Sequence, residues 1–213
     1  MAFNSLDKDG GRDQWVVAMR PKRETVDPWK PHAFLVEEEP DEAGEIASVL
    51  TVFLTNRECP WRCLMCDLWR HTLTEIVPIG AVPAQIDFAL ERVLSEVIDA
   101  QAQPVGETDP QSPNSKIGWI RRKTGTGGAE FKPIHQIKLY NSGSFFDRQA
   151  IPPDDYGPIA ERVCQFERVI LESHPSLVNE TCARFRDLLA AKASRDVAGS
   201  RTRPRLELAM GLE

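Results

Sequence analysis

The sequence predicts an α/β fold in which about four parallel strands form a sheet with helices packed outside it. Apolar stretches of strand type alternate along the chain with stretches of helical character, in the order β-α-β-α-β-α-β. This alternation is typical of parallel sheets, because each crossover helix returns the chain to start another strand in the same direction. The length of 213 residues and the apolar share of 41% suit a single domain with a buried core.

Residues 1–45 are predicted to form an irregular N-terminal arm and a short strand. Three prolines interrupt any regular pattern in the arm: Pro21, Pro28 and Pro31. A short apolar run covers residues 33–36, and the acidic stretch 37–45, with its proline and glycine, is typical of a turn. The core domain is therefore expected to span residues 46–213.

Four segments are strand candidates because they are short, apolar and rich in β-branched residues. The first, residues 46–55, is apolar almost throughout, as expected for a strand covered on both faces. The others are residues 134–141, 168–173 and 206–212. In parallel folds the active site lies at the carboxyl ends of the strands, so the residues that follow each strand are the candidates for function.

Three segments between the strands are helix candidates: residues 83–102, 154–165 and 176–193. Apolar residues recur at three- and four-residue steps in the first, and Pro83 suits its first turn. Ser176 is expected to cap the third, with Glu180 near the position of a capping partner. Residues 103–130 contain many glycines, prolines and polar residues and are predicted to be a loop or insertion.

Three of the five cysteines lie within eight residues, directly after the first strand: Cys59, Cys63 and Cys66. The odd count and the clustering fit a disulfide framework poorly and indicate metal or redox chemistry. Three thiolates can hold three irons of a [4Fe-4S] cube and leave the fourth iron open to a small molecule. Structural zinc takes four ligands, and His71 is available as the fourth, so a zinc-binding interaction module is an alternative.

The C-x3-C-x2-C spacing after the first strand resembles the signature of the radical S-adenosylmethionine (SAM) superfamily, although Met65 stands where that family usually has an aromatic residue. Residues 139–147, 151–153 and 172–175 resemble the branch that contains the elongator catalytic subunit and the methylthiotransferases. Within that branch they look most like the archaeosine-synthase radical SAM subunit and its bacterial relatives. The resemblance covers roughly residues 46–213 and implies a partial (βα) TIM-like barrel, shorter than the family's.

The resemblance also implies a chemistry. The three cysteines would bind a [4Fe-4S] cluster, and one electron from a flavodoxin- or ferredoxin-type donor would cleave bound SAM to methionine and a 5′-deoxyadenosyl radical. That radical would take a hydrogen atom from a substrate, for which an RNA or tRNA nucleoside is the leading expectation. Three nearby arginines are expected to favour the thiolates: Arg57, Arg62 and Arg70.

Polar residues at the ends of the later strands are the other cofactor-binding candidates: Asn141, Ser142, Gly143, Ser144, Glu172 and Glu213. Residues 142–144 occupy the place of the family's Gly-Gly-Glu motif, which receives the methionine amino group. The glutamate is absent here, so serine hydroxyls or backbone carbonyls are expected to replace it. Each candidate also has a simpler interpretation, namely a turn for 141–144, an arginine partner for Glu172 and a solvated chain end for Glu213.

The formal net charge of −6 argues against a general nucleic-acid coat protein, while short basic runs near residues 121–123 and 201–205 leave a local RNA contact open. No apolar stretch approaches the length of about 18 residues that a membrane helix needs, and the polar start is unlike a secretory signal, so a cytoplasmic protein is expected. Because the predicted barrel is short, two further alternatives are a partner subunit that completes it and a truncated, inactive radical SAM fragment.

Overall fold

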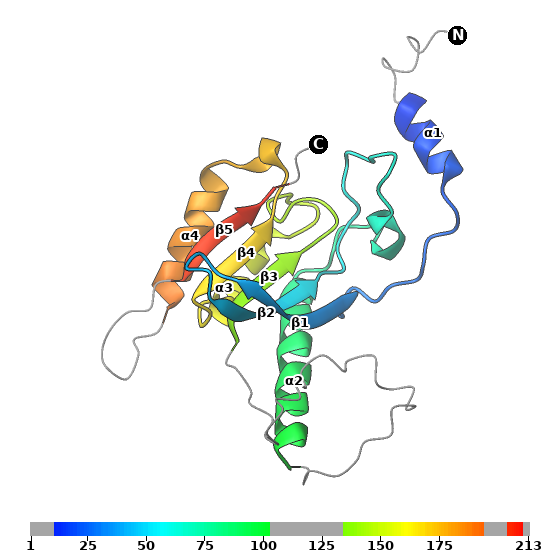
Figure 1. Ribbon diagram of the computed structural model, residues 1–213. Coiled ribbons are helices and arrows are strands. Elements are labelled where there is room, and N and C mark those ends of the chain that lie inside the picture. Colours follow the sequence, from blue (N-terminus) through cyan, green and yellow to red (C-terminus); the bar gives the residue numbers. More distant parts are fainter. Residues whose placement is uncertain (1–10, 103–133, 194–203, 211–213) are drawn as a thin grey trace.

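The computed structural model describes residues 11–102, 134–193 and 204–210, in which five strands form one sheet in the order β1-β2-β3-β4-β5 (Figure 1). Neighbours in the chain are therefore neighbours in the sheet. Strands β2 to β5 run parallel to one another. Their bounds are Ile46–Phe53, Ile134–Tyr140, Arg168–Glu172 and Arg205–Ala209. The prediction of an α/β fold with about four parallel strands is confirmed, and the described strands form an open sheet.

Strand β1 (Ala33–Pro40) is antiparallel to β2 and covers that edge of the sheet. The sequence predicted only a short strand and a turn over residues 37–45, which is wrong for the first four of these residues. The strand continues through its acidic residues because two of them pair with a lysine on β3, two strands away in the sheet. Glu37 and Glu39 both pair with the buried ammonium group of Lys138 on β3.

Helix α1 (Gly11–Met19) lies in the arm that was predicted to be irregular, so that prediction is wrong for this stretch. The interrupting prolines all come after it, and nothing within it prevents helix formation. Val16 is its buried residue, and the guanidinium of Arg12 donates a hydrogen bond to the carbonyl of Trp61 at 3.5 Å. The helix is therefore linked to the segment that carries the cysteines.

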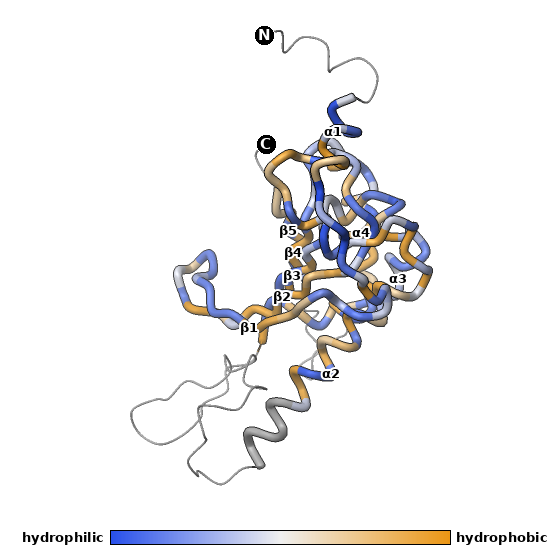
Figure 2. Tube along the Cα trace, turned by 90° about the vertical axis from the view of Figure 1, so that its right-hand side faces the viewer, coloured by the Kyte–Doolittle hydropathy of each residue, from blue (hydrophilic) through white to orange (hydrophobic). Residues whose placement is uncertain are grey.

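Three helices pack on one face of the sheet: α2 (Ala81–Ala102), α3 (Tyr156–Val163) and α4 (Glu180–Lys192). Figure 2, which views the sheet from its side, places all three on the same side of the strands. Short 3-10 turns are found at Leu68–His71 (η1), Pro153–Asp155 (η3) and Pro175–Leu177 (η4). The core lies between this face and the helices and includes fully buried Leu50, Ile86, Ile137, Phe145 and Phe185.

Helix α4 begins later than predicted. Ser176 lies in η4, and the cap is Asn179, whose Oδ1 accepts a hydrogen bond from the backbone N–H of Thr181 at 2.8 Å. The prolyl residue at the start of η4 favours a separate short turn there, so Asn179 takes the cap position.

The other face of the sheet is polar, because side chains alternate between the two faces of a strand. Lys138 stands between the core residues Ile137 and Leu139 and points away from the helices to its two carboxylates. On β4, the guanidinium of Arg168 donates to Gln136 at 2.9 Å and pairs with Glu207 on β5. Ion pairs between β1 and β3, and between β4 and β5, thus give the buried charges on this face their partners.

Some predicted features fall outside the described residues, namely the loop or insertion 103–130, the basic run 121–123 and Glu213. Across the described ranges, no helix combines the length and the apolar character that crossing a membrane requires.

Candidate functional site

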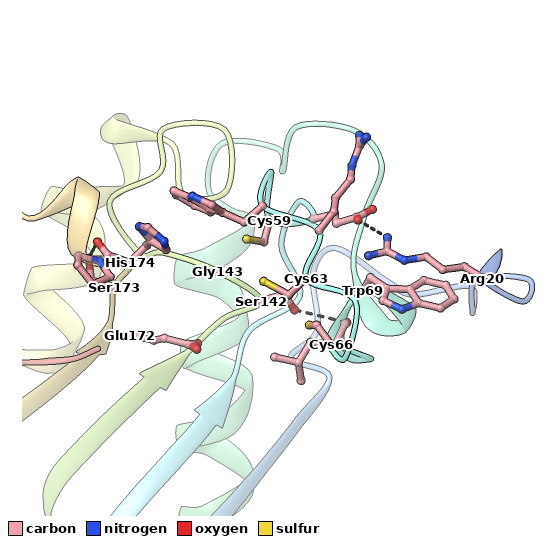
Figure 3. A pocket seen from close by; sticks show the side chains of 15 residues that line it. Arg20, Cys59, Cys63, Cys66, Trp69, Ser142, Gly143, Glu172, Ser173 and His174 are labelled. Atoms are coloured by element: carbon pink, nitrogen blue, oxygen red, sulfur yellow. Dashed lines mark hydrogen bonds and ion pairs between the residues drawn. The ribbon is translucent and has the colours of Figure 1, made fainter. Parts of the chain in front are cut away.

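The site lies at the carboxyl ends of the parallel strands, where the chain leaves β2 and loops across the edge of the sheet. Figure 3 shows Cys59, Cys63 and Cys66 of this loop facing one pocket. Ser142 and Gly143, which follow β3, and Glu172, which ends β4, line the same pocket. We call it the cysteine pocket. Residues from three separate parts of the sequence therefore meet at the edge of the sheet where parallel folds place their functional residues.

The cysteine loop is closed at its base by backbone hydrogen bonds. The N–H of Leu73 donates to the carbonyl of Asn56 at 2.8 Å, and the N–H of Glu58 donates to the carbonyl of Leu73 at 3.0 Å. Within the loop, the N–H of Cys66 donates to the carbonyl of Cys63 at 3.2 Å. These bonds hold the cysteines on a short, closed segment, and none of the five cysteines, all of which are described, forms a disulfide.

Gly143 allows the β3 end to approach the cysteine loop. A Cβ atom at this position would lie 2.9 Å from Cys59 Cβ and 3.4 Å from its Sγ, and the backbone φ is +149°. Both the contact and the backbone conformation therefore favour glycine. The close approach gives Gly143 a packing role, and its predicted part in cofactor binding stays a prediction.

The thiol of Cys59 is not held as a thiolate. Burial raises its pKa to about 11, and the charges of Cys63 and Cys66 add to the rise. The predicted activation by arginines is not found. Arg57 donates to Gln149, and the Arg62 guanidinium lies 3.7 Å from Asp13. A metal centre at this pocket would therefore have to displace the Cys59 proton, as metal binding to thiols generally does.

Within the described residues, the three cysteines are not drawn together as ligands of a single metal ion. A cluster places each cysteine on a different iron, so the sulfurs need not converge on one point. His71, which a zinc site would need, does not line the cysteine pocket. Its ring stacks on His32 at 3.7 Å between centroids, and its Nδ1 lies 3.1 Å from a Glu24 carboxylate oxygen.

The candidate cofactor-binding residues that follow β3 and β4 do not all lie in the cysteine pocket. Ser142 Oγ lies in the cysteine pocket and donates to the carbonyl of Leu68 at 3.5 Å. Ser144 is buried and outside the pocket, where its hydroxyl pairs with that of Ser173 at 3.1 Å. Asn141 is also buried and lines a neighbouring pocket instead. Glu172 accepts a hydrogen bond from the backbone N–H of Asn141 at 2.8 Å.

Sequence reasoning missed Glu58, the residue before Cys59. One of its carboxylate oxygens pairs with Arg20 and the other with Arg23, both from the N-terminal arm. Burial alone would raise the pKa of Glu58, but the hydrogen bonds from the two arginines outweigh it and lower that pKa. The pairing joins segments more than 30 residues apart in the sequence. The sequence signal for it is weak, namely an acidic residue, Glu58, directly before a cysteine.

The same arginines contact Trp69 in η1. The Arg20 guanidinium carbon lies 4.7 Å from the centroid of the Trp69 ring, and Arg23 donates to the Trp69 carbonyl at 2.6 Å. Trp69 is buried, with 6% of its surface exposed. The arm therefore fixes both ends of the cysteine loop, at Glu58 and at Trp69. We call Arg20, Arg23, Glu58 and Trp69 the arginine strap.

A second aromatic contact forms one wall of the cysteine pocket. Trp61 from the loop stacks on His174, which follows β4, at 3.7 Å between ring centroids and 15° between planes. His174 is fixed in turn by Ser176, whose hydroxyl lies 2.7 Å from its Nδ1. The stack connects the cysteine loop to the segment that follows β4.

Comparison with known proteins found no match for this chain among family models, curated proteins or solved structures.

Proposed function

We propose that this chain is a radical SAM protein in which Cys59, Cys63 and Cys66 bind a [4Fe-4S] cluster and leave one iron open to SAM. The observation that carries the proposal is the position of these cysteines. They have the C-x3-C-x2-C spacing, follow the first parallel strand and face one pocket with the ends of the next two. When bound, the cluster supplies the electron, received from a flavodoxin- or ferredoxin-type donor, that cleaves SAM to methionine and a 5′-deoxyadenosyl radical.

The residues of the chain have separate roles in this proposal. The three thiols lose their protons on binding the cluster and fix it at the edge of the sheet. Glu172 stands in for the glutamate that residues 142–144 lack, because its carboxylate lines the same pocket and suits the ammonium group of SAM. Ser142 and the backbone around Gly143 contact the same end of the cofactor. The Trp61–His174 stack shields the reacting centre from water.

The proposal is tested by measuring 5′-deoxyadenosine formed from SAM under a chemical reductant, without oxygen, after iron and sulfide have been supplied. We expect product from the wild type and only background from Cys59→Ala, Cys63→Ala and Cys66→Ala. Cys164→Ala is the matched control, since this half-buried thiol lies at the end of α3 and outside the pocket, and it should retain activity. Stoichiometric zinc in place of iron would support the zinc-binding interaction module instead. A cluster with no SAM cleavage would support the truncated, inactive fragment or the need for a partner subunit.

An RNA or tRNA nucleoside is proposed as the substrate by resemblance alone. Of the arginines in the basic run at residues 201–205, the structure describes Arg205, which gives the proposal little support because it is paired with Glu42 and Glu207, while Arg201 and Arg203 lie outside the described residues. A cytoplasmic location belongs to the same proposal, since a reducing compartment keeps cluster-binding thiols reduced.

A further inference from the structure

A second pocket opens beside the cysteine pocket, and we infer that it binds the planar base of a nucleoside substrate. This inference deepens the proposed function and rests on it for the link to the cluster. The two pockets share Leu68, Ser142 and Glu172. The second has a volume of about 360 Å³, within the usual range for small organic ligands, whereas the cysteine pocket has about 100 Å³. We call it the histidine pocket.

The walls of the histidine pocket are rich in aromatic rings. Phe53 and Tyr140 come from the ends of β2 and β3, with ring centroids 6.0 Å apart. His32 and His71 line it as a stacked pair at 3.7 Å, with 18° between their planes. Aromatic side chains of this kind recognise unstacked bases through their faces, and every base has such a face.

The charge of the pocket selects against phosphate. Asp67 and Glu172 contribute carboxylates, and the lining residues, all within the described ranges, include neither lysine nor arginine. Burial, followed by the charge of His71, lowers the pKa of His32, which disfavours a positive charge on that ring. The lining therefore favours uncharged groups and exocyclic amines over anions, and the phosphates of a nucleotide are expected to stay outside.

Asn141 supplies the polar contact that a base edge requires. The residue is 4% exposed and lines the pocket, and neither Nδ2 nor Oδ1 has a hydrogen-bond partner in the described part of the chain. A buried amide without partners is costly, so a ligand that supplies them gains affinity. An adjacent donor and acceptor would satisfy both atoms at once, and base edges present such pairs, as in the bidentate contact between asparagine and adenine.

Two sources of this chemistry are consistent with the pocket, the adenine of SAM and the base of a separate substrate. We would titrate the cluster-free, full-length chain with the four ribonucleosides, with adenosine 5′-monophosphate and with S-adenosylhomocysteine, using calorimetry and ligand-observed NMR. At least one nucleoside should saturate, with magnetisation transferred mainly to its base protons. The monophosphate should bind more weakly than adenosine. Simultaneous binding of the nucleoside and S-adenosylhomocysteine is the expected result, because it assigns the pocket to a substrate base. Displacement of the nucleoside by S-adenosylhomocysteine would assign the pocket to the adenine of the proposed cofactor and would overturn the inference.

Variants of Asn141 test whether the nucleoside binds in the histidine pocket. Asn141→Ala should weaken nucleoside binding by about tenfold or more, and the nearly isosteric Asn141→Asp should weaken it too, because it loses the donor. Gln165→Ala, an exposed amide after α3, is the matched control and should bind as the wild type does.

Failure of all four nucleosides to saturate the folded wild type would overturn the inference. So would equal binding by the Asn141 variants, or tighter binding of the monophosphate than of adenosine. Iron analysis of a reconstituted sample separates the two proposals. A cluster without nucleoside binding removes the base pocket alone, and nucleoside binding without a cluster removes the proposed function alone.

Discussion

Gly143 shows at the scale of one residue how tightly the cysteine loop packs on the sheet edge. Its position leaves no room for a side chain beside Cys59, and its φ of +149° disfavours any other residue. The need for glycine therefore follows both from the packing against Cys59 and from the backbone conformation.

We predict that Gly143→Ala destabilises the chain by about 1–3 kcal/mol, since the new Cβ would overlap Cys59 and the backbone would be strained. It should also lower the amount of iron retained after reconstitution. Gly157→Ala is the control, because no atom lies within 4 Å of the Cβ built there and the residue is in α3. That change should be neutral or stabilising. Equal unfolding midpoints for the two variants in urea would contradict the packing argument.

At the scale of elements, the arginine strap connects the N-terminal arm to the cysteine loop. Glu58 is 15% exposed and satisfies two guanidinium groups at once. Two charges of the same sign converge on one carboxylate, so removing that carboxylate leaves both without their partner. The arm therefore contributes to the order of the site although none of its residues is a candidate ligand.

Glu58→Gln should lower the free energy of unfolding by about 1–2 kcal/mol at pH 7, measured by urea denaturation. Because the strap lowers the Glu58 pKa, its contribution is present above the ordinary value of 4.5 and is lost as the pH falls through the lowered value. The difference between wild type and variant should therefore shrink in acid. Glu180→Gln, which removes an exposed pair with Arg184, should have little effect. A difference independent of pH would contradict the role of the charge.

The start of α4 offers another test at this scale. Asn179→Ala should cost about 1 kcal/mol, because it removes the side chain that accepts the hydrogen bond from the Thr181 N–H. Ser176→Ala should cost less, since Ser176 lies before the helix in η4. Thermal unfolding of both variants measures the two losses of stability. A larger loss for Ser176→Ala than for Asn179→Ala would show that Ser176 caps the helix, as the sequence suggested.

Sequence patterns predicted the elements whose burial is regular, and they failed where partners come from distant segments. The regular spacing of apolar residues in α2 and the continuous apolar run in β2 arise because these residues face the core, so both elements could be predicted. The extension of β1 depends on Lys138, about a hundred residues away, and the role of Glu58 depends on Arg20 and Arg23. A single sequence carries no signal for such pairings. Of the site, the cysteines and Glu172 were predicted to share one edge, but the inward turn of Ser144 was not.

At the scale of the whole molecule, the parallel order of the strands explains why distant residues meet. The ends of β2, β3 and β4 lie side by side, so the residues that follow each strand share one edge of the sheet. The helices cover one face (Figure 2). The opposite face carries paired charges. The sheet thus holds the loops at its carboxyl edge in place, and these loops carry the candidate functional residues.

The most direct test of the central claim is electron paramagnetic resonance of the reduced, reconstituted chain, recorded with and without SAM. We predict the signal of a reduced [4Fe-4S] cluster that shifts when SAM is added and is absent from Cys59→Ala, Cys63→Ala and Cys66→Ala. The shift is expected because, under the proposed function, SAM binds directly to the open iron. A cluster signal that persists in all three variants, or a protein that holds zinc and no cluster, would contradict the assignment of these cysteines.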